Sequence, residues 1–369
     1  MPQATGAIGV LKLLGRRTQI YLVVALIASA LAGLFSGLGA NAVLIFVISA
    51  VALALLAALV GEATEQVGAR LGPGATGVLQ SALGNLPELF VAVFALRAGL
   101  VAVVQAALVG SILGNSLLVL GLAFLVGGLR HGTQRFTAEA PRMMATLTLL
   151  AVAALIMPTL SQQLHTPASG HIEALSLICA VALLVVFAIS IPVAISGAAP
   201  QSVPGPTKEE REAEAPLWPV WLAAMLLAVA GIGAAFVSDW FVNALTPAIH
   251  VLHLSETFTG LVVVAIAGNA VENVVGVQLA AANKPDYAIS VILNSSLQVA
   301  LGLFPVLVLL SLVIGGAHLT LTLPLLLIVA LGLAAILGAV VVFDGESTWL
   351  EGAALIGLYV IIAMAFWWG

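Results

Sequence analysis

Charged residues are scarce in this chain. Asp, Glu, Lys and Arg together make up 7% of its 369 residues, whereas roughly a quarter is usual in soluble domains. Hydrophobic residues make up 62%. This composition excludes a soluble globular protein and predicts an all-α polytopic membrane protein, because helices satisfy their own backbone hydrogen bonds within a bilayer. We expect the lipid bilayer as a partner and no nucleic acid.

The chain also lacks cysteine pairs and familiar catalytic motifs. Cys179 is the single cysteine, which excludes an intrachain disulfide. No His-Glu-x-x-His zinc motif and no Gly-x-x-x-x-Gly-Lys nucleotide loop occurs. The acids and amides within the apolar runs have no paired nucleophile and base. We therefore expect no enzymatic activity and no cofactor.

Apolar runs of about 20 residues, broken at charges, prolines and glycines, predict eleven transmembrane helices. They lie near residues 19–37, 41–67, 75–97, 101–128, 142–161, 171–196, 217–243, 258–282, 286–313, 319–343 and 348–367. Arg16 and Arg17 precede the first run without an evident cleavage site, which indicates a retained helix rather than a signal peptide. The polar stretch 197–216 is predicted to be a solvated, acidic cytoplasmic linker.

The distribution of basic residues predicts the orientation. With a cytoplasmic N-terminus, ten of the eleven Lys and Arg residues fall on the inner side and only Arg97 falls outside. The ten are Lys12, Arg16, Arg17, Arg70, Arg130, Arg135, Arg142, Lys208, Arg211 and Lys284. The C-terminus is then expected outside, in a membrane of the bacterial inner-membrane type.

One acidic motif within the apolar runs occurs twice. Gly84-Asn85-Leu86-Pro87-Glu88 and Gly268-Asn269-Ala270-Val271-Glu272 share the form Gly-Asn-x-x-Glu, 184 positions apart. Ser111 and Ser295 each follow the motif glutamate by 23 positions. The predicted topology places the two motifs in helices of opposite direction, so we expect an inverted repeat of the kind found in secondary transporters.

This repeat divides the chain into four predicted parts. The N-terminal tail and first helix occupy 1–40, the first five-helix repeat 41–196, the linker 197–216 and the second five-helix repeat 217–369. Pro87 is expected to weaken its helix by leaving the carbonyl of Leu83 without a donor.

The two motif glutamates are the candidate ion-binding residues. A carboxylate at the centre of a membrane helix costs about 2.5–3.5 kcal/mol, which argues against a packing role alone for Glu88 and Glu272. A protonated, helix-bridging glutamate remains the plainer alternative. Asn85 and Asn269 lie three positions before them, on the same helix face. Carboxylate and amide oxygens suit alkali and alkaline-earth cations or protons.

Two longer runs resemble a known family. The run GNLPELFVAVFALRAGLVAVVQAALVGSILGNSLLVLGLAFLVGG and the run SETFTGLVVVAIAGNAVENVVGVQLA, with VILNSSLQVALGLFPVLVLL after it, resemble the two signature regions of the calcium/cation exchanger superfamily, in its cation/proton branch. Gly61-Glu62-Ala63-Thr64-Glu65 is similar to a further family segment. An acidic loop between the sixth and seventh helices is also a family feature.

The resemblance implies the roles of several residues. Glu88 and Glu272 correspond to the central cation- and proton-binding carboxylates, and Asn85 and Asn269 to the motif asparagines. Supporting polar positions correspond to Ser111, Asn115, Ser295, Ser296 and Gln298. Three residues depart from the family pattern: Asn294 replaces a usual Gly, Asn273 replaces a frequent His, and Pro87 is more typical of the sodium/calcium branch.

These residues suggest calcium/proton exchange by alternating access. Calcium takes six to eight oxygens, which two carboxylates, amides, carbonyls and waters can supply. Two carboxylates in a low-dielectric site are expected to bind protons when the cation leaves. Glu62 and Glu65 on one side, and Asp239 and Glu256 on the other, could form acidic mouths or be ordinary interfacial carboxylates.

Other ion pairs remain open. A sodium/calcium or a monovalent cation/proton antiporter would use the same carboxylates. An ion channel is disfavoured, because a selectivity filter normally needs rings from several subunits. The sequence does not decide cation selectivity, stoichiometry, affinity or oligomeric state.

Overall fold

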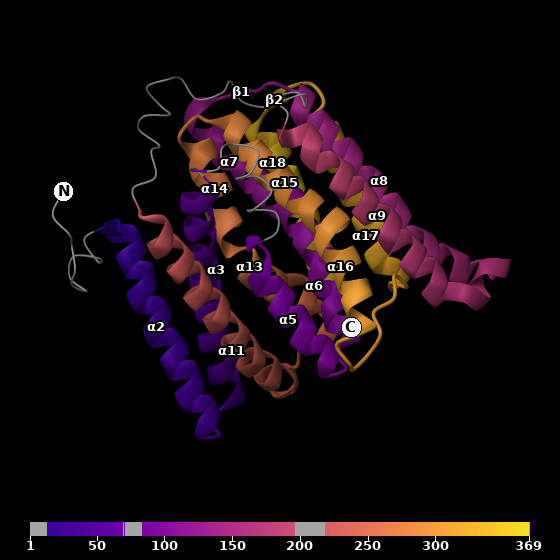
Figure 1. Cartoon of the computed structure of the whole chain (residues 1–369). Coiled ribbons are helices and arrows are strands. Elements are labelled where there is room, and N and C mark those ends of the chain that lie inside the picture. The colour runs from indigo at the N-terminus through magenta and orange to yellow at the C-terminus, as the bar shows by residue number, and fades with distance from the viewer. Residues whose placement is uncertain (1–12, 69, 71–82, 196–217, 369) are drawn as a thin grey trace. The chain divides into compact units, whose positions relative to one another are not determined.

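The structure is a computed structural model that describes residues 13–68, 70, 83–195 and 218–368. Helices dominate the described residues, as the composition predicts (Figure 1). Seven of these helices are long and apolar enough to cross a membrane, or eight if one bent pair is counted as a single span. The predicted linker 197–216 lies outside the described residues. The count of eleven spans stays a prediction.

The chain forms two compact units, each of which is described by itself. The first contains Met1–Phe94 and Gly205–Leu252, and the second contains Ala95–Pro204 and His253–Gly369.

Three long helices form most of the first unit: α2 (Arg16–Gly37), α3 (Ala42–Gly68) and α11 (Val220–Leu252). α3 packs along both of the others. Its ring contact with α11 is a stack of Phe46 on Phe241, with centroids 4.8 Å apart. α3 begins where the side chain of Asn41 accepts from the backbone N–H of Val43 at 2.9 Å. Many large apolar side chains of α2 are exposed, as expected for a helix that contacts lipid.

α11 is longer than the predicted helix 217–243. It continues to Leu252, because Val220–Leu252 is apolar nearly throughout and its Pro247 is accommodated within the helix. At 1.5 Å per residue its 33 residues span roughly 50 Å, more than the ~30 Å hydrocarbon core. The predicted helix 217–243 places Asp239 at its outer end; this is wrong, since thirteen positions follow Asp239 within α11.

A shorter helix, α5 (Leu86–Arg97), begins in the first unit and carries the first motif glutamate. The predicted helix 75–97 falls partly on residues outside the described ranges. Pro87 lies in the first turn of α5, where no N–H donor is needed. Gly84 and Asn85, just before α5, form a turn, so the helix is interrupted next to Pro87 as expected.

The second unit contains two helical rods, each interrupted by a π-helical turn. The first rod is α6 (Val101–Leu113), η1 (Gly114–Val119) and α7 (Leu120–His131). The second is α15 (Pro285–Gln298), η4 (Val299–Leu303) and α16 (Phe304–Ser311). The 184-residue offset of the sequence motif carries η1 onto 298–303, one residue from the observed start of η4. The two rods therefore share their irregularity as well as their sequence pattern.

The two rods run antiparallel. Just after α7, the Gln134 side chain donates to the carbonyl of Ala280 at 3.1 Å and to Oδ1 of Asn283 at 2.9 Å, close to the start of α15. At the other end, Ala317 after α16 donates its N–H to the carbonyl of Leu96, just before α6, at 3.1 Å. Figure 1 shows the same arrangement, with α7 and α15 at one end and α6 and α16 at the other.

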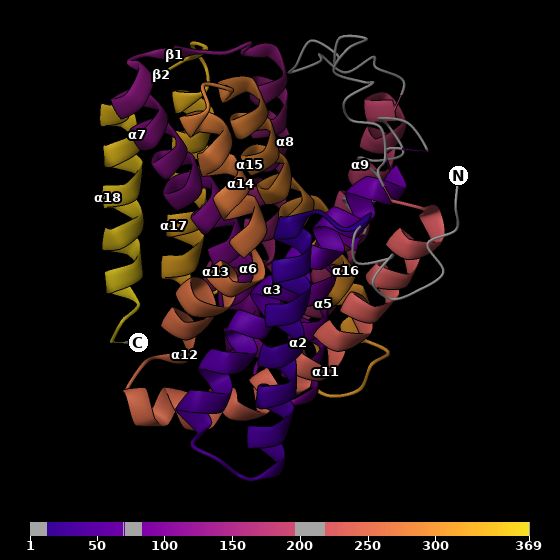
Figure 2. The same cartoon turned by 90° about the vertical axis from the view of Figure 1, so that its left-hand side faces the viewer.

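Further helices surround the rods. They are α8 (Glu139–Gln163), η2 (Pro167–His171), α9 (Ile172–Ile195), α12 (Glu256–Phe258), η3 (Thr259–Val264), α13 (Ala265–Gly268), α14 (Ala270–Ala281), α17 (Leu325–Val341) and α18 (Trp349–Ala365). α18 packs against α7 (Figure 2). α17 packs against α8. Two short strands, β1 (Gln134–Arg135) and β2 (Glu346–Ser347), pair antiparallel. They hold the loop after α7 against the loop after α17.

The predicted helix 319–343 begins later than expected, at Leu325. Residues before it are extended, and Leu319, Leu321 and Leu323 are buried at alternate positions. Side chains of four helices satisfy this backbone: Gln105 donates to the carbonyls of Thr320 and Thr322 at 3.0 Å each, and hydroxyls of Ser311, Ser176 and Thr159 accept from Leu319, Leu321 and Leu323. Irregular backbone is tolerated at membrane depth where protein encloses it in this way.

Candidate functional site

Glu88 and Asn85 lie at the start of α5 in the first unit. Asn85 directly precedes the helix and is buried, and its carbonyl accepts from the N–H of Leu89 at 2.9 Å. Glu88 is half-buried in the first helical turn. The unpaired N–H groups and the dipole at a helix N-terminus favour a negative charge there. The first motif therefore places a carboxylate beside the unpaired N–H groups of a helix start.

Glu272 occupies the equivalent position in the second unit. α13 ends at Gly268, and the segments Glu256–Gly268 and Glu272–Ala281 meet at a 65° bend. α14 starts directly after Asn269 and has 12 residues, as α5 has. Glu88 and Glu272 are each the third residue of their helix, in its first turn. The repeated sequence motif thus produces the same local structure twice: an interruption of the helix, followed by a new helix with a glutamate in its first turn.

Asn269 is the centre of a buried hydrogen-bond network. Its Nδ2 donates to Oγ of Ser111 at 2.8 Å and to the carbonyl of Ala265 at 3.0 Å. Its Oδ1 accepts from Asn115 and from Ser295, both at 3.4 Å. Asn115 also donates to Oγ of Ser295 at 2.9 Å. The network connects the break before α14 to both rods, so it fixes the position from which Glu272 projects.

A second polar contact lies beside this network. The hydroxyls of Ser116 and Ser296 are 3.2 Å apart and both side chains are buried. Gln298, further along α15, is also buried. The family resemblance implies Ser296 and Gln298 but not Ser116, which lies in η1. Its signal was the short polar pair Asn115-Ser116 within an apolar run.

A small cavity adjoins the network. Its volume for a water-sized occupant is about 10 Å³, and its polar lining comes from Ser111, Asn115, Asn269 and Asn273. Oδ1 of Asn273 is buried and has no hydrogen-bond partner. Asn269 directly precedes α14 and Asn273 lies four positions later, with its N–H donating to the carbonyl of Asn269 at 3.0 Å, so the two residues lie on the same side of the helix start. These neutral groups suit water or a small monovalent ion better than a divalent cation.

The structure thus brings four predicted residues into direct contact: Ser111, Asn115, Asn269 and Ser295. Asn85 and Glu88 belong to the first unit. A cation site shared by Glu88 and Glu272 therefore stays a prediction. Among the described residues, no group of three or more His, Cys, Asp or Glu side chains is placed to hold a metal ion.

The four predicted mouth residues lie in different settings. Glu62 and Glu65 lie in the last two turns of α3, and Oε2 of Glu62 is buried without a hydrogen-bond partner. Asp239 accepts from Nδ2 of Asn243 at 3.2 Å and lines an apolar groove between α5 and α11. Glu256 is exposed in the first turn of α12. Their role as acidic mouths stays a prediction.

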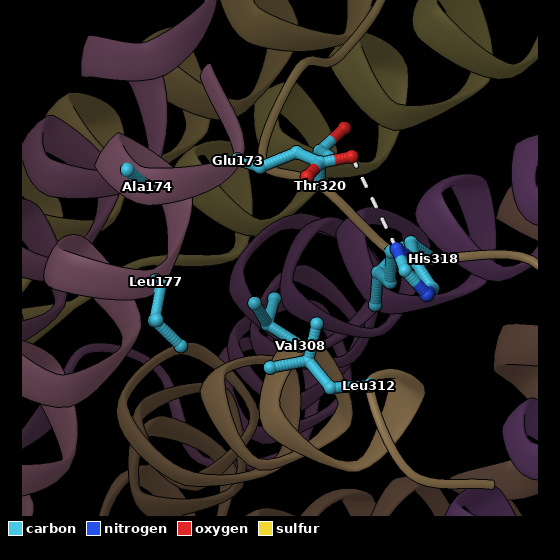
Figure 3. A pocket seen from close by; sticks show the side chains of 8 residues that line it. Glu173, Ala174, Leu177, Val308, Leu312, His318 and Thr320 are labelled. Carbon is cyan, nitrogen blue, oxygen red and sulfur yellow. Dashed lines mark ion pairs between the residues drawn. The ribbon is translucent and has the colours of Figure 1, made fainter. Parts of the chain in front are cut away.

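A larger pocket lies at one edge of the second unit, away from the network. It has a volume of about 230 Å³, and α9, α16 and the extended residues after α16 form its walls. Figure 3 shows Glu173, His318 and Thr320 together, with Leu177, Val308 and Leu312 across from them. Glu173 Oε1 and His318 Nδ1 are 4.0 Å apart and largely exposed. Two exposed groups at this distance do not make a binding site for a transported ion.

The chain is similar to known proteins over most of its length. The family described as sodium/calcium exchanger protein matches residues 41–195 and 222–368, two segments of similar length. The Ca(2+)/H(+) antiporter of Synechocystis is 36% identical over 348 residues, which cover 89% of this chain and 92% of that protein. The Ca(2+)/H(+) antiporter ChaA of Bacillus subtilis is 33% identical and covers 87% and 91%, respectively.

Solved structures resemble the whole chain as well. The structure of native YfkE has a TM-score of 0.79 at 30% identity, covering 94% of this chain and 99% of that one. The H+/Ca2+ exchanger CAX has a TM-score of 0.75 at 15% identity, covering 95% and 92%. The sodium-calcium exchanger NCX_Mj has a TM-score of 0.53 at 18% identity, covering 87% and 96%. The last two likenesses concern the fold alone.

Proposed function

Because the chain belongs to the sodium/calcium exchanger protein family, we propose that it is a secondary active antiporter that exchanges calcium for protons across a membrane. The transported species follow from relatives named Ca(2+)/H(+) antiporters. The observation in this chain that carries the proposal is the repeated motif, which puts one glutamate into the first turn of α5 and another into the first turn of α14.

The second part of the proposal is an inverted repeat of two five-helix halves, within eleven transmembrane helices. The antiparallel rods support it, since each contains a π-helical turn at the equivalent position. The two segments matched by the family support it too. In such repeats, alternating access arises when one part of the protein moves against another around a midplane site.

The third part is the orientation, with the N-terminus in the cytoplasm and the C-terminus outside. Four basic residues lie at one end of the second unit: Arg130, Arg135, Arg142 and Lys284. Hydrogen bonds and an ion pair between the loops and helix ends that carry them hold these segments together. Arg97 lies at the other end, beside Gly316. This asymmetry supports a cytoplasmic location for the end with β1 and β2, in a membrane of the bacterial inner-membrane type.

We assign the exchange chemistry to Glu88 and Glu272. Two carboxylates neutralise a divalent cation, and Asn85, Asn269, backbone carbonyls and water can complete its shell of oxygens. When calcium leaves, protons replace it, because two like charges in a low-dielectric site repel each other. The empty, doubly charged site is too costly to cross, so transport is coupled. Each proton that moves down one pH unit supplies about 1.4 kcal/mol to drive calcium.

The test uses purified protein in liposomes with an inside-acidic pH gradient and radiolabelled calcium outside. Wild type is expected to take up calcium. Glu88→Gln and Glu272→Gln each remove one of the two charges that face the cation, and we expect uptake to fall about 100-fold. Glu139→Gln is the matched control, because this glutamate is exposed at the start of α8.

Two results would contradict the proposal. Wild-type uptake that requires a sodium gradient instead of a proton gradient would favour sodium/calcium exchange, and cation screening would identify a monovalent cation/proton antiporter. Normal uptake by both glutamine variants would remove the paired-glutamate mechanism.

A further inference from the structure

Asn273 follows Glu272 directly, and the oxygen of its side-chain amide has no hydrogen-bond partner in the protein. This oxygen, Oδ1, is buried. An amide oxygen has two lone pairs, and buried polar atoms of folded proteins nearly always have a protein or water partner. An oxygen left without one would destabilise the fold. We therefore expect a hydrogen-bonding partner for Oδ1 of Asn273 in the space beside it.

The cavity beside Asn273 has the size and chemistry for that partner. Its volume of about 10 Å³ corresponds to a single water molecule. Ser111, Asn115 and Asn269 line it together with Asn273, so a water would find several polar groups. No carboxylate lines the cavity, which disfavours a divalent ion. An alkali cation would bring an uncompensated charge into this uncharged lining, which burial makes costly.

We propose that one buried water occupies this cavity and that Asn273 acts through it as a positioning residue for Glu272. This inference rests on the proposed function. α14 is separated from α13 by the bend, so its first turns need lateral support. Asn269 supplies that support at the helix start, through Ser111 and Asn115. The water supplies it one turn later, because Asn273 lies four positions further on the same face.

The first test fills the cavity. Gly114 lines the cavity, and a Cβ added there would meet no heavy atom within 4 Å, so Gly114→Ala adds a methyl group to the cavity wall without a clash and leaves less room for the water. Asn273→Leu removes the acceptor and keeps the side-chain size similar. Gly357→Ala is the control, because this glycine is exposed on α18 and its Cβ would also meet nothing.

Both cavity variants are expected to raise the KM for calcium about three- to tenfold, with the maximal rate changed less than twofold. Gly114→Ala is also expected to lower the apparent Tm, because it leaves the buried Oδ1 of Asn273 without a partner, whereas Asn273→Leu removes that oxygen. The KM of the double variant is expected to resemble that of each single variant, because the second change acts on a water that is already absent. A merely structural role would lower the amount of folded protein and leave the KM unchanged. Gly357→Ala is expected to match wild type.

The second test does not depend on transport. A crystal structure that shows ordered water is expected to have a density peak within hydrogen-bond distance of Asn273 Oδ1 in wild type and none in Gly114→Ala. An empty wild-type cavity, or a wild-type KM in both single variants, would overturn the inference and leave the antiporter assignment standing. Wild type that moves no calcium under a pH gradient would instead remove the proposed function, while the density would still decide about the water.

Discussion

The contact between α6 and η3 depends on a glycine, and Gly110→Ala tests how strongly. A Cβ at this position would lie 2.1 Å from the carbonyl oxygen of Leu261 and 2.6 Å from its Cα. Ordinary contact begins near 3.4 Å. The two elements would have to separate by roughly 1.3 Å, and overpacking of this kind costs about 1–3 kcal/mol. The obstacle is backbone, which cannot rotate away.

The same separation would act on the polar network. Ser111 is the next residue of α6, and its 2.8 Å hydrogen bond to Asn269 would lengthen beyond bonding range. Hydrogen bonds between membrane helices contribute about 0.6 kcal/mol on average. Together the two effects predict a loss of about 2–4 kcal/mol.

The assay is thermal unfolding of the detergent-solubilised protein, with Gly357→Ala as the control. Gly110→Ala is expected to lower the apparent Tm by several degrees and to reduce calcium uptake per folded protein, while the control leaves both unchanged. A Gly110→Ala protein as stable as the control would refute the close backbone approach of α6 and η3.

Two further predictions concern the second unit. Gln105→Leu leaves the carbonyls of Thr320 and Thr322 without their donor, so we expect a loss of about 1–4 kcal/mol of stability in thermal unfolding. Gln163→Leu is the control at an exposed site. Equal Tm values for the two variants would contradict the conclusion that Gln105 stabilises the extended backbone at 319–323. Arg135→Gln breaks an exposed ion pair with Glu346 at 3.1 Å, which is worth less than about 1 kcal/mol; a Tm drop as large as that of Gln105→Leu would show that the pair matters more than its exposure implies.

Much of the helical structure is predictable from the sequence because long apolar runs have few stable alternatives in a bilayer. The predicted runs 19–37, 41–67 and 101–128 agree with α2, α3 and the first rod to within a few residues. The start of α17 was missed. The alternation Leu-Thr-Leu-Thr-Leu at 319–323 has the period of an extended strand, and Pro324 follows it. The average hydropathy of this segment does not reveal the alternation.

Part of the candidate site is also predictable. The spacing of the two motifs indicates Ser111, Ser295 and Asn269, and these side chains do meet. The pairing of Ser116 with Ser296, and the lack of a protein partner for Oδ1 of Asn273, were not predictable, because a side chain's partners depend on which helices pack beside it. The same holds for Gly110, whose importance comes from the backbone of η3 across the contact.

The sequence by itself determined that this chain is a helical membrane protein with a duplicated acidic motif, because hydropathy and motif spacing are local properties of the chain. The tertiary structure decided what surrounds the second motif. Only packing could show that Asn269 connects the break before α14 to both rods, that the rods are antiparallel, and that the extended residues 319–323 are enclosed by four helices. Hydrogen bonds between residues more than a hundred positions apart form only after the helices have assembled.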